Sequence, residues 1–250
     1  MTAAAIEARG LGKDFGSIRA LDQLDLDVRE GEFFGLLGPN GAGKTTTVHL
    51  LATLLAPTRG TARVGGHDVA RDDLAVRRVI GLVFQETTLD RDLTVQENLR
   101  FAARLWNLPG RLAVPRIEAL VRQFGLFERR ADPVRTLSGG MRRAADLARG
   151  MLHEPRVLFL DEPTAGLDPR ARRSLWDLIR RLRQASGLTV FLTTHYVEEA
   201  EPCDRVAVMD HGRLVALGTP ADLKRTTGVG SLEEVFLART GHPLAETGAG

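Results

Sequence analysis

Short apolar runs alternate with helical patterns along the chain. The clearest runs cover residues 33–37, 79–84, 157–160 and 188–192. Each run has the length of a strand that is buried on both faces. A helical pattern over residues 45–55 follows the first run, and we expect it to end before Pro57 because proline cannot continue a helix. This alternation predicts an α/β fold with a mainly parallel sheet.

A later helix is predicted from an apolar stripe with a helical period. Its members are Leu175, Leu178, Ile179 and Leu182. Side chains with this spacing lie on one face of a helix and cover a core. The arginines around the stripe are expected to form a solvated face.

Strand signals stop between about residues 85 and 155, and helical patterns replace them. Residues 94–97 read Thr-Val-Gln-Glu, a capping box that opens a helix. Pro115 is expected to start a second helix that ends at Gly125, and residues 141–152 form a third. The inner faces of the first two helices are expected to be Leu99, Ala102, Ala103 and Trp106, and Ile117, Leu120, Val121 and Phe124. We interpret the stretch as a helical subdomain inserted into the α/β core.

The last third of the chain predicts a hairpin and a short helix. Residues 206–209 and 213–216 read as two strands joined by a tight turn, which adds a small antiparallel part to the fold. Ser231 caps a final helix, and residues 241–250 are expected to be a loose tail. We therefore assign residues 1–85 and 155–220 to the α/β core, residues 86–154 to the helical subdomain and residues 221–250 to the C-terminal helix and tail.

Composition narrows the possible functions. The 34 Lys and Arg side chains nearly balance the 32 Asp and Glu side chains, for a formal net charge of +2. Nucleic-acid-binding proteins normally concentrate basic side chains on one face, so we expect no nucleic-acid partner. The single cysteine, Cys203, excludes an internal disulfide and fits a reducing compartment. We find no signal peptide and no run of about 18 apolar residues that could span a membrane, so we expect any membrane part to belong to another chain.

Residues 38–45 match the phosphate-binding pattern G-x-x-x-x-G-K-[ST], directly after a predicted strand and at the start of a helix. Glycines let the loop surround a phosphate with backbone N–H groups, and the helix N-terminus adds a favourable partial charge. Lys44 can reach the β- and γ-phosphates, and the Thr45 hydroxyl can bind Mg²⁺. The predicted ATP-binding residues of this loop are Gly38, Pro39, Asn40, Gly41, Ala42, Gly43, Lys44, Thr45 and Thr46.

Two adjacent carboxylates follow the apolar run at 157–160. Asp161 and Glu162 are expected at the carboxyl edge of the sheet, where parallel sheets bind their ligands. Asp161 suits the Mg²⁺ shell, and Glu162 suits a general base that polarises the attacking water. By itself the pair is also typical of a polar strand end, but a phosphate loop in the same sheet favours the catalytic interpretation.

A family resemblance appears when the motifs are read in order. Residues 137–141 read Leu-Ser-Gly-Gly-Met and precede the acidic strand, while residues 161–169 read Asp-Glu-Pro-Thr-Ala-Gly-Leu-Asp-Pro. Together with the phosphate loop, they resemble the ATP-binding cassette family over about residues 5–225. The resemblance implies a RecA-like P-loop NTPase core. It also implies that two cassettes pack head to tail, with each nucleotide between one phosphate loop and the partner's signature segment. Here that segment comprises Ser138, Gly139, Gly140 and Met141, and it departs from the family where methionine replaces the usual glutamine.

The resemblance assigns roles to four further residues. Gln85 resembles the glutamine that touches Mg²⁺ and the attacking water, and His195 resembles the switch histidine that contacts the γ-phosphate. Phe15 matches the aromatic residue that stacks on adenine, although an isolated Phe is more often a core residue. Asp168 resembles the aspartate at the dimer interface, and it can also cap the helix that Pro169 begins.

These motifs predict a Mg-dependent ATPase that powers a separate membrane permease from the cytoplasmic face of the membrane. Residues 138–143 and 231–237 look most like those of drug- and antibiotic-resistance exporters, and related cassettes export lipids, polysaccharides or ions. The alternatives are an importer subunit or a non-transport cassette that acts on ribosomes or DNA. A P-loop kinase would leave residues 137–140 unexplained. The transported substrate, the permease and the choice between homodimer and heterodimer stay open.

Overall fold

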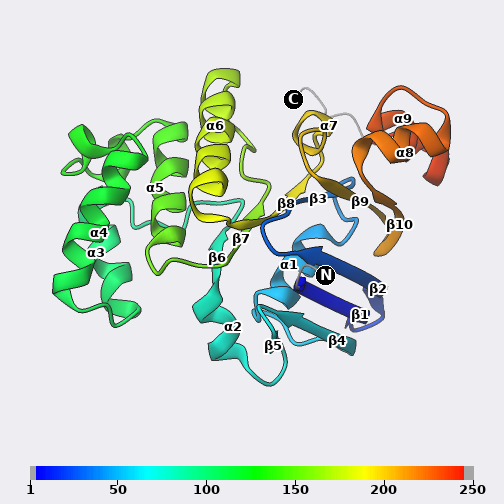
Figure 1. Cartoon of the computed structure of the whole chain (residues 1–250), viewed down its shortest axis with the longest axis horizontal. Coiled ribbons are helices and arrows are strands. Elements are labelled where there is room, and N and C mark those ends of the chain that lie inside the picture. Colours follow the sequence, from blue (N-terminus) through cyan, green and yellow to red (C-terminus); the bar gives the residue numbers. More distant parts are fainter. Residues whose placement is uncertain (1–3, 245–250) are drawn as a thin grey trace.

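A six-stranded sheet forms the centre of the protein in the computed structural model, which describes residues 4–244 (Figure 1). The strand order is β10-β9-β3-β8-β7-β6, and only β10 runs antiparallel to its neighbour. The strands are β3 (Phe33–Leu37), β6 (Ile80–Val83), β7 (Val157–Asp161), β8 (Thr189–Thr194), β9 (Arg205–Asp210) and β10 (Arg213–Gly218). The mainly parallel sheet and the predicted hairpin are therefore confirmed.

A second, antiparallel sheet covers one side of the central sheet. Its order is β2-β1-β4-β5, with β1 at Ala4–Phe15, β2 at Ile18–Arg29, β4 at Arg59–Val64 and β5 at His67–Asp68. The sequence analysis assigned none of these strands. The β1–β2 register shifts at several points, and each shift interrupts the polar–apolar alternation that reveals a strand.

The central sheet is buried on both faces because its strands alternate between two apolar cores. In β7, Val157 and Phe159 face the antiparallel sheet and helix α1 (Lys44–Leu51), whereas Leu158 and Leu160 face helix α6 (Pro169–Ser186). Phe159 also packs against Phe191, with ring centroids 5.4 Å apart. The structure therefore has three layers, with the phosphate-loop helix α1 between the two sheets.

Two predicted helix boundaries are wrong. Helix α1 ends at Leu51 rather than at residue 55, because Thr53 adopts a left-handed conformation with φ 62° and breaks the helical path before Pro57 is reached. Helix α4 (Gly110–Gln123) begins five residues before Pro115, which lies inside it. Pro109 sits at the N-cap and starts the helix instead, so Pro115 removes one hydrogen bond without ending the helix. The predicted strand at 79–84 is also shorter, since Val79 ends helix α2 (Asp73–Val79).

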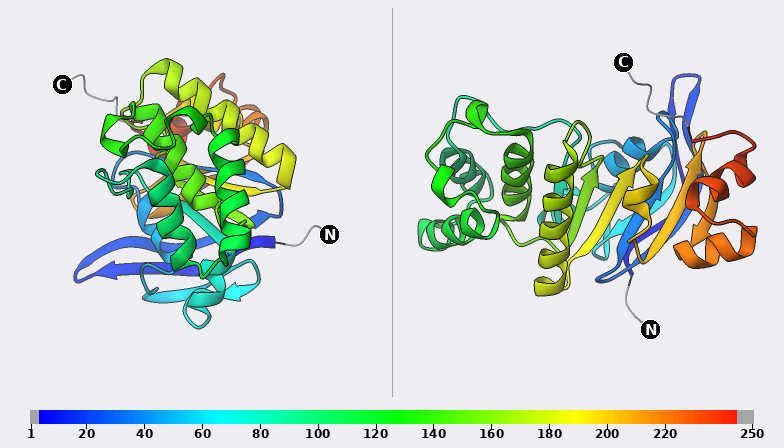
Figure 2. Two further views of the ribbon diagram at one scale, coloured as in Figure 1. Left: turned by 90° about the vertical axis from the view of Figure 1, so that its left-hand side faces the viewer. Right: turned by 90° about the horizontal axis from the view of Figure 1, so that it is seen from above.

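The helices predicted between residues 86 and 154 lie together at one end of the molecule (Figure 2). They are α3 (Val95–Leu105), α4 and α5 (Gly139–Met151). Their predicted inner faces are buried except for Trp106, which is half-buried and stacks on His153 with ring centroids 4.0 Å apart. That these residues form a separate subdomain stays a prediction.

The C-terminal helices lie at the opposite end, beside β9 and β10 (Figures 1 and 2). Helix α8 spans Pro220–Thr227, and α9 (Leu232–Thr240) begins with the capping box of Ser231. The expectation of a loose tail is wrong at its start, because Leu244 is buried in the core; residues 245–250 lie outside the described residues. The short helix α7 (Val197–Ala200) completes the fold, and no helix of residues 4–244 is long and apolar enough to cross a membrane.

The capping box of α3 gives a testable stability prediction. The Thr94 hydroxyl accepts the N–H of Glu97 at 3.1 Å, and the Glu97 carboxylate accepts the N–H of Thr94 at 2.8 Å. Replacing Thr94 with alanine leaves a helix N–H without its acceptor, so we expect the free energy of unfolding to fall by about 1 kcal/mol. Urea denaturation followed by circular dichroism measures the change. Thr61→Ala, at an exposed position of β4, is the control, and equal losses in both variants would contradict the capping role.

Candidate nucleotide-binding site

Three loops meet at the carboxyl edge of the central sheet. Strand β3 leads into the phosphate loop, β7 ends at Asp161, and β8 ends just before His195. These strands are parallel neighbours in the order β3-β8-β7, so their carboxyl ends deliver the three loops to one place. A cavity of about 400 Å³ opens there. It is lined by Ala20, Asn40, Gly41, Gly43, Lys44, Thr45, Thr46, Gln85 and Glu162.

The phosphate loop depends on two glycines. A Cβ on Gly38 would lie 2.5 Å from the backbone oxygen of Met209, which is too close for any side chain. Gly43 has φ 98°, and a Cβ there would lie 2.7 Å from the backbone oxygen of Ala20. The loop also contains a backbone hydrogen bond of its own, in which the Ala42 N–H donates to the Pro39 oxygen at 3.2 Å. Helix α1 begins at Lys44, so its free N–H groups point toward the cavity.

Lys44 is buried beneath the loop that it follows. Its ammonium donates to the backbone oxygens of Gly38 at 2.8 Å and Pro39 at 3.0 Å, and it lies 3.2 Å from Oε1 of Glu162. Burial lowers the pKa of Lys44, and the nearby Glu162 carboxylate opposes that shift. The Lys44 ammonium at the cavity is therefore paired with groups of the protein itself, and a more highly charged anion could replace them as its partner.

The two carboxylates are held in different ways. Asp161 accepts hydrogen bonds from the hydroxyls of Thr45, at 3.2 Å, and Thr193. Glu162 has φ 45°, a rare conformation for a residue with a side chain, and its N–H donates to both the backbone oxygen and the hydroxyl of Thr193 at 3.1 Å. Its Oε2 lies 3.1 Å from Nδ1 of His195. The backbone at Glu162 thus turns the carboxylate toward Lys44 and His195.

The predicted signature segment lies elsewhere in the chain. Ser138 is the exposed N-cap of α5, and its hydroxyl accepts the N–H of Met141 at 3.3 Å. Asp168 caps α6 and accepts the N–H groups of Arg170 and Ala171 at 2.9 Å, as one of its two predicted roles requires. Ser138, Gly140, Met141 and Asp168 all line a second cavity of about 450 Å³. Neither Ser138 nor Asp168 lines the phosphate-loop cavity of the same chain.

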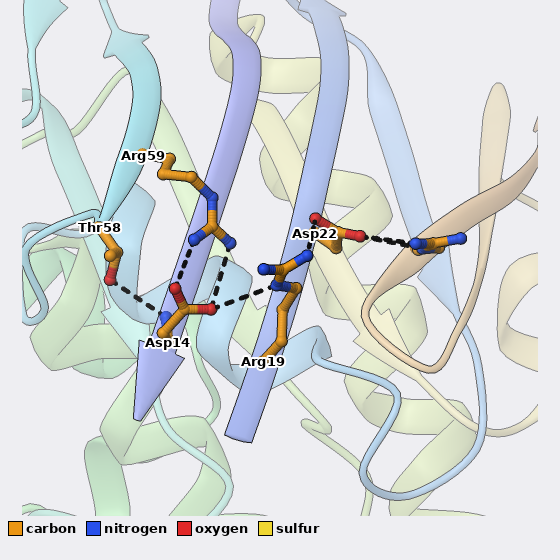
Figure 3. A network of polar contacts seen from close by, with 6 residues as sticks. Asp14, Arg19, Asp22, Thr58 and Arg59 are labelled. Carbon is orange, nitrogen blue, oxygen red and sulfur yellow. Dashed lines mark hydrogen bonds and ion pairs between the residues drawn. The ribbon is translucent and has the colours of Figure 1, made fainter. Parts of the chain in front are cut away.

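Phe15 lies at the tip of the β1–β2 hairpin and is 45% exposed, so it is not a core residue. An ionic network behind it joins β1, β2, β4 and β10 (Figure 3). Arg59 donates two hydrogen bonds to Asp14, and Arg19 lies between Asp14 and Asp22. Arg59 holds the pKa of Asp14 below its usual value. The network fixes the hairpin, and the exposed ring of Phe15 lies at its tip with the Lys13 ammonium 5.2 Å from the ring centroid.

Comparison with known proteins decides the family. The family model described as ABC transporter matches residues 21–165. The chain belongs to the ABC transporter family. It is 48% identical to the daunorubicin resistance ATP-binding protein DrrA3 of Streptomyces coeruleorubidus, over 96% of this chain and 76% of that protein. It is 49% identical to the daunorubicin/doxorubicin resistance ATP-binding protein DrrA of Streptomyces peucetius, over 90% and 68% of the two chains.

A solved structure of an ATP-binding subunit of an ABC transporter superposes on the chain with a TM-score of 0.84. It shares 31% identity and covers 94% of this chain and 99% of that one. The protein is therefore an ABC transporter ATP-binding subunit: it binds ATP, hydrolyses it to drive transport and works with a membrane permease. These points confirm the predicted fold class, family and ATPase activity.

The structure of this ABC subunit reveals a buried residue that the sequence analysis missed. Glu199 of α7 is 2% exposed and accepts hydrogen bonds from the hydroxyls of Thr164 and, at 2.6 Å, Thr194. It thereby ties the loop after Glu162 to the residue before His195. Glu199 follows His195 by one helical turn, but no sequence motif distinguishes it from the exposed Glu198 beside it.

A second missed residue, Arg143 of α5, is also buried. Its guanidinium donates to the backbone oxygens of Phe84 and, at 2.6 Å, Gln85. The Gln85 side chain is exposed at the cavity rim, so this contact holds its backbone in place from behind. An arginine in an amphipathic helix usually faces solvent, so the sequence gives no sign that Arg143 is buried. Only the packing of α5 in the folded chain shows it.

Glu199 predicts a particular pH dependence of stability. Burial raises its pKa above the ordinary value of 4.5. The unfolded chain therefore loses the Glu199 proton at a lower pH than the folded chain does. As a result, stability falls as pH rises from 4.5 to the folded pKa and is then constant. Glu199→Gln removes this contribution, so between those pH values the wild type should lose up to about 1.4 kcal/mol per pH unit more than the variant.

Chemical denaturation at a series of pH values measures this difference. Glu198→Gln is the matched control, because it makes the same chemical change at the adjacent, exposed position. Its pH profile should follow that of the wild type. Identical profiles for Glu199→Gln and wild type would show that the buried carboxyl does not titrate as proposed.

Proposed function

We propose that this chain is the Mg-dependent motor of a drug-resistance exporter and lies on the cytoplasmic face of the membrane, bound to its permease. The proposal that ATP is hydrolysed at this site rests on the buried contact of Glu162 with both Lys44 and His195. The export direction is supported by near 50% identity to two relatives named for daunorubicin resistance. An importer subunit is the alternative.

ATP binding is assigned to the loop and the hairpin around the 400 Å³ cavity. The backbone N–H groups of the loop and the ammonium of Lys44 suit the phosphates, and the loop can adopt this path because Gly38 and Gly43 have no Cβ to collide with the neighbouring backbone. A γ-phosphate would replace the neutral backbone oxygens of Gly38 and Pro39 as partners of Lys44 and would bring a full negative charge. The exposed ring of Phe15 suits stacking on the adenine.

Thr45, Asp161 and Gln85 fit a Mg²⁺ ion. The Thr45 hydroxyl and an Asp161 oxygen lie 3.2 Å apart, and both are oxygen donors of the kind that Mg²⁺ prefers. The Gln85 side chain lies at the rim of the same cavity. When bound, the ion would neutralise phosphate charge. The protein's own part is to hold these oxygens in place, which Thr193 does for Asp161.

Hydrolysis requires a base for the attacking water, and Glu162 fits that role. Its carboxylate borders the cavity, and its φ of 45° directs it inward. The water oxygen forms a bond to the γ-phosphorus while the bond from phosphorus to the ADP oxygen breaks, giving ADP and phosphate. Glu162 takes the water proton and returns it to phosphate or solvent. His195 lies 3.1 Å from Glu162, and within the described residues its Nδ1 makes no hydrogen bond, so it is available to contact the γ-phosphate.

A second cassette is needed to complete the site. The exposed Ser138 and the half-buried Gly139 and Gly140 form the start of α5, whose free N–H groups can bind a γ-phosphate in a neighbouring chain. Asp168 caps α6 at the edge of the same surface and is proposed to cross the interface. Met141 offers no amide hydrogen bonds, so the Ser138 hydroxyl and the backbone carry the recognition. The partner is a second copy of this chain or a related cassette.

The role of Glu162 is tested by Glu162→Gln, which removes the base and keeps the shape. We expect ATP affinity to be retained and turnover to fall by about 10²- to 10⁴-fold. ATP binding is measured by equilibrium dialysis, turnover by phosphate release, and the association state by size-exclusion chromatography with ATP. ATP should trap the variant as a dimer of cassettes.

Two comparison variants sharpen this test. Lys44→Ala should weaken ATP binding itself, because it removes the cation beneath the loop. Glu233→Gln makes the same chemical change as Glu162→Gln at an exposed position of α9 and should hydrolyse ATP like the wild type. Wild-type turnover in Glu162→Gln would exclude Glu162 as the base.

The export function is tested by producing the chain together with its permease in a drug-sensitive host. We expect the pair to lower the accumulation of an anthracycline in cells, because ATP hydrolysis drives it outward. The pair carrying Glu162→Gln should leave accumulation at the level of cells with the permease alone. Fluorescence of the drug in cells measures the effect. Uptake that rises with ATP hydrolysis would favour the importer alternative.

A further inference from the structure

Two histidines and an aspartate meet at the β9–β10 turn, outside the nucleotide cavity. Asp210 ends β9, His211 lies in the turn, and His242 follows helix α9. Each residue offers one nitrogen or oxygen atom, and these three atoms lie within 4.8 Å of one another. Residues that are far apart in the sequence are thus brought together where the C-terminal segment packs on the hairpin. Neither the ATPase mechanism nor the dimer interface uses them.

The hydrogen bonds of His242 fix which ring nitrogen faces the cluster. Nδ1 lies 3.3 Å from the backbone oxygen of Pro243, which can only accept, so this contact is a hydrogen bond in the tautomer with its proton on Nδ1. Nε2 lies 3.1 Å from Oδ2 of Asp210. In a neutral imidazole, Nε2 then presents a lone pair to a carboxylate, and the two repel each other. A positive charge at this point, either a second proton on the ring or a metal ion between the groups, removes the repulsion.

The other oxygen of Asp210 also lacks a proper partner. Oδ1 lies 2.8 Å from Nδ1 of His211, yet among the described residues no group makes a hydrogen bond of acceptable geometry to it. This oxygen is shielded from solvent, and a buried oxygen without a partner is uncommon. Among the described residues Oδ1 therefore lacks a hydrogen bond, and Oδ2 has one that needs a proton on Nε2 of His242, whereas a cation between the three residues would suit both oxygens.

We propose that Asp210, His211 and His242 bind a divalent transition-metal ion of the zinc class. Two imidazole nitrogens and one carboxylate oxygen are the ligands that such ions take, whereas Mg²⁺ prefers oxygen alone. The contact from Nδ1 of His242 to the Pro243 oxygen is the outer hydrogen bond that usually orients a metal-binding histidine. The His211 side chain is 83% exposed, so it is free to move onto the ion. Water would complete the coordination.

An ion at this place would join the segment after α9 to the hairpin turn. The turn is also attached to the phosphate loop, because the N–H of Gly212 donates to the Ala42 oxygen at 3.0 Å. The Gly212 oxygen accepts the N–H of Asp22 at 2.8 Å, which connects the turn to β2. Metal binding would therefore restrain three parts of the chain at once, and we expect it to stabilise the fold.

The test is a titration of the full-length chain with ZnCl₂, without nucleotide or Mg²⁺, followed by isothermal calorimetry and by thermal unfolding. We expect one ion per chain. At a zinc concentration of about one hundred times Kd, the Tm should rise by roughly 5–10 °C, because the ion binds only the folded chain. Co²⁺ in place of Zn²⁺ gives an absorption spectrum that reports nitrogen ligands directly.

Variants separate this site from binding elsewhere. His211→Gln and His242→Gln should each weaken zinc binding at least about tenfold, and the double variant should abolish the Tm rise. His67→Gln is the control, because His67 lies in β5 outside the cluster. Unchanged affinity in the double variant, or no saturable binding to the wild type, would overturn the proposal. A Tm that responds to pH but not to zinc would show that a protonated His242 paired with Asp210 accounts for the geometry.

Discussion

The parallel pairing of β3, β8 and β7 is the constraint on which the site depends. It brings the ends of three strands to one edge and so places the Lys44 ammonium and the Glu162 carboxylate at one cavity, with His195 3.1 Å from that carboxylate. Lys44 and Glu162 are 4% and 8% exposed, and they lie 3.2 Å apart. Neither charge could be buried so deeply without the other, because an unpaired buried ion costs several kcal/mol. The sheet therefore stabilises these two charges as well as positioning them.

The layer beneath this edge consists mainly of threonine hydroxyls. Thr193 bonds both Asp161 and the backbone of Glu162, while Thr164 and Thr194 share the buried Glu199. Hydroxyls can donate and accept, so they satisfy carboxylates of either protonation state at low cost in volume. This layer keeps the strained backbone of Glu162 in its inward conformation. This layer and Ser138 at the start of α5 lie at different places in the chain, since Ser138 does not line the phosphate-loop cavity.

Most elements with a regular apolar period were predictable from the sequence. The central strands follow from short apolar runs and the stripe of α6 from its helical period, and the caps of α3, α6 and α9 follow from short local hydrogen-bond patterns. The antiparallel strands β1 and β2 were missed because register shifts disturb their alternation. The start of α4 was placed too late because Pro115 lies inside a helix whose other contacts outweigh one lost hydrogen bond.

The sequence by itself determined the chemistry: a phosphate loop, an acidic pair and a serine-glycine segment are local patterns, and their residue types limit what they can bind. Only the tertiary structure decided which of these groups meet. It brought Lys44 to Glu162 and His195, buried Glu199 and Arg143 behind them, and placed His242 beside Asp210. The physical reason is that these contacts join residues far apart in the chain, and only strand order and packing, rather than local periodicity, set such distances.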